Sequence, residues 1–147
     1  MQHSIPLPNI SEQRMAVLTI EADNSCQILK DNLNAPHYGS AEHINLSEIS
    51  RKHLMSEHEG WEPPSPILVV AWFEQFQQVF PEYGTEDRLA SVLGLRGKNA
   101  GRRIRDFKSG SAPVPYGIWR RFLVMTGRAS QEIIPVLGIF DMPETTV

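Results

Sequence analysis

Cationic and amide side chains gather in one short stretch of the chain, between positions 96 and 108. A guanidinium group donates two hydrogen bonds at once, to guanine O6 and N7 or to phosphate oxygens, and an asparagine amide pairs with adenine in a similar way. An ammonium group binds phosphate as a point charge. The chemistry expected of this stretch is therefore recognition of a polyanion. The residues that carry it are Arg96, Lys98, Asn99, Arg102, Arg103, Arg105 and Lys108.

The charge of the chain is divided unevenly along its length. The 147 residues carry a net charge of −3. Residues 1–84 hold four basic and eleven acidic residues, whereas residues 85–128 hold ten basic and three acidic residues. The net charge is therefore −7 over the first range, +7 over the second and −3 over the remainder. Such asymmetry favours contact between residues 85–128 and a polyanion.

The basic stretch also has the apolar spacing of a helix. Ala100, Ile104 and Phe107 recur at intervals of four and three residues, which predicts one buried face on a helix from Lys98 to Lys108. The basic residues then point outward. Because the start of a recognition helix usually meets base edges, we predict base contacts from Lys98, Asn99, Arg102 and Arg103. We assign phosphate contacts, which position a protein without specifying sequence, to Arg96, Arg105 and Lys108.

A second predicted helix lies immediately before the basic one. Thr85 is a suitable N-cap, and two acidic residues in the first turn favour the helix dipole. This helix ends at Leu93, because Gly94 suits the left-handed conformation that follows a helix. The short connection through Gly97 makes the pair a helix-turn-helix arrangement. Further helices are predicted over Ile67–Val79, Tyr116–Met125 and Ser130–Leu137. Arg120 and Arg121 either add phosphate contacts or cover the surface.

The second half of the chain resembles a known family. Three features carry the likeness: the run Leu89-Ala90-Ser91-Val92-Leu93-Gly94-Leu95, the basic helix ending in Lys108-Ser109-Gly110, and Val114-Pro115 followed by Trp119. Together they resemble the Cro/phage-repressor type, or lambda-repressor-like, helix-turn-helix domain over residues 66–128. The resemblance implies a bundle of four or five helices and a role in transcriptional repression. In a departure from the family, the stretch from Gly94 to Gly110 is several residues longer.

Gly101 falls inside the predicted basic helix, where glycine costs about 1 kcal/mol relative to alanine. Either another backbone approaches closely at this position, or the helix begins later than Lys98. A later start would change the register of the residues assigned to base contacts.

The first part of the chain is predicted to extend a mainly α fold. The β-branched run Arg14–Glu21 favours a strand, and residues 27–29 are placed to pair with it as a short hairpin. Asn45 and Glu48 form a candidate capping box for one helix, Leu46–Glu57. The prolines that follow indicate a linker. Trp61 lies beside these prolines, and we expect it to anchor the linker to the bundle. We therefore divide the chain into an acidic N-terminal segment 1–60, a linker 61–66 and a helix-turn-helix domain 67–140.

Several classes of function have no support in the sequence. His43, His53 and His58 match no zinc-binding spacing, and we interpret them as solvated histidines on a helix face. No phosphate-binding glycine loop or nucleophile elbow is present, so we expect neither catalysis nor a cofactor. The apolar runs are too short for a membrane span, and the start of the chain does not resemble a signal peptide. With Cys26 as the single cysteine, these features favour a cytoplasmic protein.

We therefore expect a sequence-specific regulator that binds double-stranded DNA and acts as a repressor and as a homodimer. Dimerisation is inferred because two half-sites compensate for the limited affinity of one short helix. Residues 5–29, as paired strands, or the last helix would form the seam. The alternative is a protein-interaction module, antitoxin-like or a phage or plasmid adaptor, whose residues 1–60 bind a partner protein. RNA binding through the basic helix is a third and less favoured hypothesis, because aromatic residues are not interleaved with the arginines.

Overall fold

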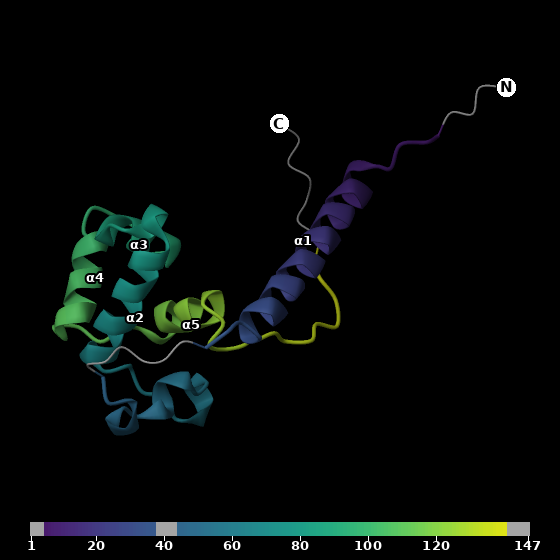
Figure 1. Ribbon diagram of the computed structural model, residues 1–147. Helices are drawn as coiled ribbons and strands as arrows, with labels where there is room; N and C mark the ends of the chain where they lie inside the picture. The colour runs from purple at the N-terminus through teal and green to yellow at the C-terminus, as the bar shows by residue number, and fades with distance from the viewer. Residues whose placement is uncertain (1–4, 38–43, 141–147) are drawn as a thin grey trace.

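The computed structural model describes residues 5–37 and 44–140, and within these ranges the chain is all-α with no strand. A compact bundle and one long projecting helix make up most of the structure (Figure 1). The five α-helices are α1 (Ile10–Leu33), α2 (Pro66–Val79), α3 (Glu86–Val92), α4 (Ala100–Ser109) and α5 (Tyr116–Met125). Short 3₁₀ turns span Leu46–Glu48, Arg51–Leu54, Glu57–Glu59 and Pro81–Tyr83.

The core lies where α2, α3, α4 and α5 meet. Aromatic rings from α2 and α5 fill its centre, with the Phe73 and Phe122 centroids 5.0 Å apart and Trp72 stacked on Trp119 at 5.7 Å. Trp119 and Phe122 are fully buried. Close packing of these aromatic rings holds the four helices in fixed positions relative to one another. The mainly α prediction is confirmed.

The boundaries of the bundle helices follow the predicted stop and start signals. Thr85 caps α3, because its side-chain oxygen accepts a hydrogen bond of 3.3 Å from the Arg88 amide. Gly94 and Gly110, which follow α3 and α4, have φ values of 86° and 82°. The value at Gly94 confirms the left-handed helix end predicted there, and Gly110 ends α4 in the same conformation. Helix α5 spans the predicted Tyr116–Met125, and α2 begins one residue earlier than predicted.

The predicted β-hairpin is wrong, because residues 14–29 lie inside the continuous helix α1. Asn9 and Glu12 form a full capping box, with reciprocal hydrogen bonds of 2.8 Å between side chain and backbone. No glycine or proline interrupts the chain from position 10 to position 33. The cap and the unbroken run outweigh the modest strand preference of the β-branched residues. Among the described residues, no helix is long and apolar enough to cross a membrane.

The predicted helix Leu46–Glu57 is also wrong. Three separate 3₁₀ turns replace it, and side chains of Ser50 and Ser56 bond to nearby groups in the chain. Serine offers the backbone such local alternatives to a continuous helix. His53, interpreted as solvated, is instead 5% exposed and contacts Trp72 and Trp119 edge-on. His43 lies outside the described residues, and His58 is exposed.

Trp61 fastens this segment to the bundle, as expected of an aromatic residue beside the prolines. Its indole N–H donates a hydrogen bond of 3.1 Å to the His53 carbonyl oxygen, and its ring meets Tyr116 of α5 edge-on at 5.2 Å. The segment that includes residues 51–61 therefore packs on the surface formed by α2 and α5.

The helix predicted over Ser130–Leu137 is absent, and residues 130–140 run without helical structure. Pro135 removes a backbone donor from the middle of the predicted helix and disfavours the α conformation at Ile134. Neither predicted dimer seam therefore exists in the form expected: residues 5–29 hold no strands, and the last helix does not form.

Candidate nucleic-acid interface

Helices α3 and α4 pack against each other more extensively than any other pair of elements (Figure 1). The turn between them is fixed to the core and to α3. Its Leu95 side chain is buried, and the Leu95 amide donates a hydrogen bond of 2.9 Å to the Ala90 carbonyl oxygen. Gly97, near the top of the turn, has φ of 97°. The arrangement is two short helices joined by a tight turn that contains glycine, as the sequence predicted.

Helix α4 begins at Ala100, two residues later than predicted. Lys98 and Asn99 consequently lie in the turn, although both are exposed. Gly101 is buried, and a Cβ atom placed there would overlap the Asp87 carboxylate and lie 3.3 Å from the Asp87 backbone nitrogen. Both alternatives suggested by Gly101 thus apply: the helix starts late, and another helix approaches closely.

The inner face of α4 matches the predicted stripe. Ala100, Ile104 and Phe107 are 8%, 0% and 3% exposed. Because successive residues turn by 100° around a helix, Arg102 lies on the face opposite this stripe, with Arg103 and Arg105 on either side of it. All three arginines are exposed. Burial of the stripe therefore fixes the direction in which the arginines project.

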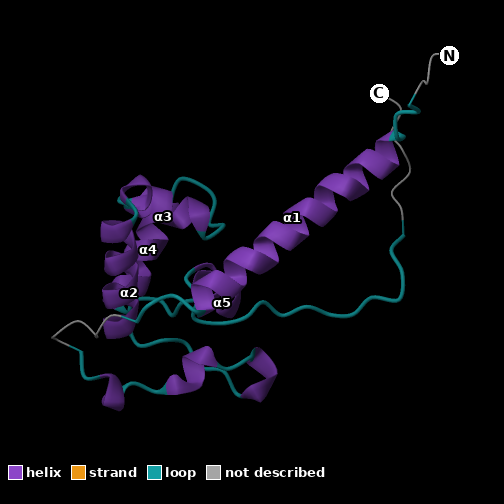
Figure 2. Ribbon diagram, turned by 45° about the vertical axis from the view of Figure 1, so that its right-hand side comes forward, coloured by secondary structure: helices purple, strands orange, loops and turns teal. Residues whose placement is uncertain are grey.

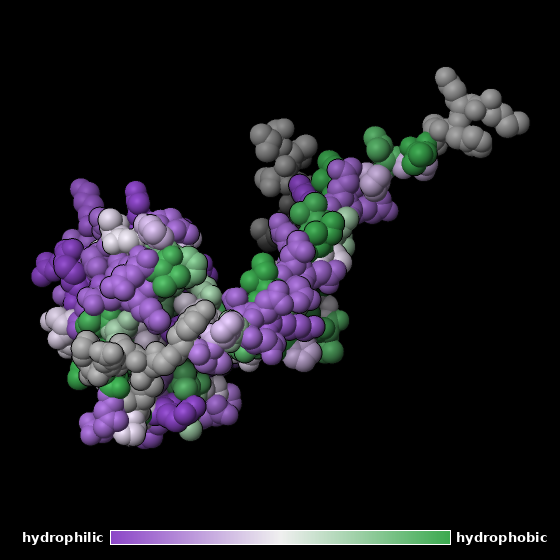
Figure 3. Space-filling model, in the orientation of Figure 1, coloured by the Kyte–Doolittle hydropathy of each residue, from purple (hydrophilic) through white to green (hydrophobic). Residues whose placement is uncertain are grey.

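Six of the predicted contact residues form one exposed surface, which we call the basic face. Its members are Arg96, Lys98, Asn99, Arg102, Arg103 and Arg105. Across the part of the chain that the structure describes, none of its cations makes an ion pair. The guanidinium carbon of Arg103 lies 6.0 Å from the centroid of the Phe107 ring, which keeps the group near the helix. The α4 side of the bundle is predominantly hydrophilic (Figure 3).

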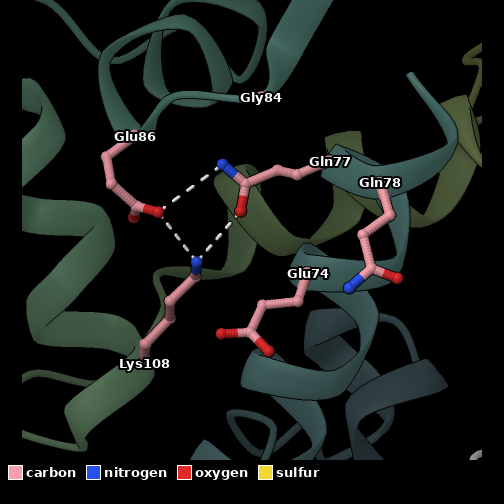
Figure 4. Close-up of a pocket in the computed structure, with 6 residues that line it drawn as sticks. All are labelled: Glu74, Gln77, Gln78, Gly84, Glu86 and Lys108. Atoms are coloured by element: carbon pink, nitrogen blue, oxygen red, sulfur yellow. Dashed lines mark hydrogen bonds and ion pairs between the residues drawn. The ribbon is translucent and has the colours of Figure 1, made fainter. Parts of the chain in front are cut away.

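Lys108 does not belong to the basic face. Its ammonium group lies 2.8 Å from Glu86 Oε1 and 3.0 Å from Gln77 Oε1, beside a shallow hollow (Figure 4). The side chains of Lys108 and Glu86 are only 15% and 26% exposed. Lys108 therefore joins the end of α4 to α2 and to the start of α3, rather than facing solvent as predicted.

Arg120 and Arg121 are also engaged within the protein. Arg121 Nε donates a hydrogen bond of 2.8 Å to the carbonyl oxygen of Val92, the last residue of α3. Arg120 donates to the carbonyl oxygens of Leu54 and Ser130, at 3.2 and 3.1 Å. These contacts favour a structural role for both arginines over the phosphate contacts that the sequence left open.

Two supporting residues went unrecognised in the sequence. The guanidinium carbon of Arg128 lies 4.2 Å from the Trp72 ring centroid, and burial lowers the pKa of this arginine. His53 accepts a hydrogen bond of 3.1 Å at Nδ1 from the Trp119 indole. Burial, with a smaller effect of Arg51, lowers the pKa of His53 to about 4, so its imidazole is neutral near pH 7. Each is isolated among unlike residues, so spacing gives no signal for it.

No protein-family model matches this chain, and no curated protein or solved structure shows significant similarity to it. The geometry of α3, the turn and α4 therefore carries the functional interpretation.

Proposed function

We propose that this protein binds double-stranded DNA through the basic face and acts as a transcription regulator. The observation that carries the proposal is the division of α4 into a packed inner stripe and an outer face of exposed arginines that pair with no acidic residue of the described ranges. The three exposed guanidinium groups of α4 do not contribute to the packing of the core. An α-helix of this kind fits the major groove, where guanidinium groups bind guanine.

The packing of α4 suggests a role for each side chain of the basic face. Arg102 occupies the outermost position and is the best candidate for a base contact. Arg103 and Arg105 flank it and lie toward the two walls of a groove, where phosphates are. Lys98 and Asn99 lie in the turn at the start of α4, near the base edges that such turns approach. Arg96, further from the helix, is assigned to a phosphate.

Charge distribution and resemblance both support this function. Residues 85–128 carry a net charge of +7 in a chain whose total is −3, so a local excess of cations faces solvent. Such an excess steers a protein toward a polyanion at long range. The likeness to the Cro/phage-repressor type of domain, with its α3-turn-α4 order, favours repression by a homodimer. The proposal implies a cytoplasmic protein with access to DNA.

The proposal is tested by the salt dependence of DNA binding. Fluorescence anisotropy on the full chain and a labelled duplex should give a logarithm of the binding constant that falls linearly with the logarithm of salt concentration. The double variant Arg102→Ala with Arg103→Ala should weaken binding at least tenfold and reduce the slope by about two. A sequence selected from a random duplex pool then supplies the specific site.

The matched control removes two exposed cations elsewhere that make no ion pair among the described residues, by Lys30→Ala with Arg51→Ala. This control should leave affinity within about twofold of the parent. Equal losses from both double variants would show that only net charge matters, and unchanged binding by the α4 variant would overturn the proposal.

A further inference from the structure

Helix α1 carries a large apolar surface that the bundle does not cover. It is 24 residues long and has no buried residue. Figure 3 shows apolar patches along its length, and Ile10, Met15, Val17, Leu18, Ile20 and Ile28 are each more than half exposed. Four of these residues, Ile10, Val17, Leu18 and Ile28, lie within about 100° of one another around the helix. This side of α1 lacks the tertiary packing of an apolar face that stabilises most helices in proteins. A partner that covers α1 is therefore expected.

Only the C-terminal end of α1 is attached to the bundle. Leu29 and Asn32 are partly covered, and a Cβ atom at Gly127 would lie 2.7 Å from the Asn32 carbonyl oxygen. The rest of the helix projects away from the bundle in both ribbon views (Figure 2). Residues 10–28 are therefore accessible to another molecule along their whole length.

The charges on the free part of α1 match a second copy of the same helix running in the opposite direction. Arg14 and Glu21 are seven residues apart, so they lie on one face of the helix, with Val17 and Leu18 between them. In an antiparallel pair that crosses near Leu18, each Arg14 lies level with the partner's Glu21. In a parallel pair in register, Arg14 lies level with Arg14. Glu12 and Asp23 lie on the opposite face and do not meet at the crossing.

We infer that two copies of this protein pair through the N-terminal two thirds of α1, antiparallel, with the crossing near Leu18. Val17 and Leu18 of both copies form the apolar centre, and two reciprocal Arg14–Glu21 pairs flank it. An interface of a single helix pair is small, so we expect a dimer that dissociates in the micromolar range.

This arrangement also sets the spacing of the two bundles. From Leu18 to Asn32 the helix rises about 21 Å, so the two points of attachment are roughly 42 Å apart along the pair. Helix α4 lies on the side of each bundle away from α1 (Figure 1), so the two basic faces are farther apart than these points of attachment.

The interface is tested by sedimentation velocity on the full chain over a range of concentrations. Arg14→Glu and Glu21→Arg should each raise the dimer dissociation constant about fivefold, because each converts two attractive pairs into two repulsive ones. The double variant with both changes should restore the parent value, since the reciprocal pairs re-form with reversed sign. Helix content from circular dichroism confirms that the comparison is between folded proteins.

A thiol-specific short cross-linker tests the orientation. In the antiparallel pair the two Cys26 residues are about 24 Å apart, so the parent chain should not cross-link. The variant Cys26→Ser with Leu18→Cys places one thiol of each copy at the crossing and should cross-link efficiently. Cross-linking of the parent through Cys26 would overturn the antiparallel arrangement.

Other occupants of α1 give different results. Leu18→Lys should abolish the dimer, and Ile133→Lys, which alters an even more exposed apolar residue of the C-terminal segment, should not. If only Ile133→Lys disrupts self-association, the C-terminal segment is the interface and the proposal fails. A monomer at all concentrations up to about a hundred micromolar also overturns it. Half-site DNA binding by such a monomer would leave the proposed function intact.

Discussion

The carboxylate of Asp87, in the first turn of α3, lies directly over the bare Cα atom of Gly101, in the first turn of α4. A side-chain carbon at position 101 would overlap this carboxylate and come within 3.3 Å of the Asp87 backbone nitrogen. Glycine therefore permits the close contact of the two helices that support the basic face. The packing that this close approach allows offsets the destabilising effect of glycine inside a helix.

Gly101→Ala should destabilise the protein by about 1 kcal/mol, although alanine favours a helix by a similar amount. The methyl group displaces the Asp87 side chain and presses on its backbone. Chemical unfolding followed by circular dichroism measures the change. Gly117→Ala is the matched control, because a Cβ at this helical glycine meets no atom within 4 Å, and it should stabilise.

In an Asp87→Ala background, the Gly101→Ala change should cost much less, because the overlapping carboxylate is gone. A double-mutant cycle gives this coupling directly. Additive effects of the two changes would contradict the close contact.

Lys108→Met should lower stability more than it lowers DNA affinity. The change leaves the Glu86 carboxylate partly buried without its cation, and one of its oxygens already has no hydrogen-bond partner. We expect a loss of about 1–2 kcal/mol in the free energy of unfolding. The salt dependence of DNA binding should retain the parent slope, because Lys108 lies outside the basic face. Adding Glu86→Gln should recover part of the stability, and a slope reduced by one would return Lys108 to the interface.

Stability should depend on pH through His53. The folded-state pKa is lowered from 6.5 to about 4, so the unfolded chain binds a proton that the folded protein does not. The contribution of neutral His53 to the free energy of unfolding is therefore fully present well above pH 6.5. It is lost as the pH falls toward 4, and the loss amounts to about 3 kcal/mol at most. His53→Gln keeps an acceptor for the Trp119 indole and should flatten this part of the profile. Urea unfolding across this pH range measures the slope, and an unchanged slope would contradict the assignment.

Sequence patterns predicted the bundle helices well because their signals are local. The stripe Ala100, Ile104 and Phe107 is buried as predicted, and the Thr85 cap and the Gly110 helix end form as expected. Periodic burial and end signals act within one or two turns, so they are visible in sequence. The exposed arginines of α4 followed from the same stripe, since burying one face exposes the other.

The predictions that failed depend on contacts distant in sequence or on competition between weak preferences. His53 is buried by Trp119, which is 66 residues away, and no spacing connects the two. Lys108 turned inward because Glu86 offers a partner from another helix. In α1 a capping box competed with a β-branched run, and the two preferences differ by too little for sequence to decide.

Gly127→Ala should release the end of α1 from the bundle. Gly127 has φ of 73°, and an added Cβ would lie 2.7 Å from the carbonyl oxygen of Asn32, in the last turn of α1. A backbone carbonyl cannot rotate away as a side chain can, so the helix end must move. Amide hydrogen exchange over residues 29–33 should accelerate at least tenfold, while exchange in the core of α2 and α5 changes little.

The variant Gly60→Ala is the control that separates the effect of the Gly127–Asn32 contact from the effect of backbone strain. Gly60 also has a positive φ, of 94°, but a Cβ there meets no atom within 4 Å. This control should lower stability by about 1 kcal/mol, as Gly127→Ala does through strain, without accelerating exchange over residues 29–33. Equal exchange at the end of α1 in both variants would show that Gly127 does not hold this helix. Faster exchange in Gly127→Ala alone would identify the Asn32 contact as the attachment that fixes how α1 projects from the bundle.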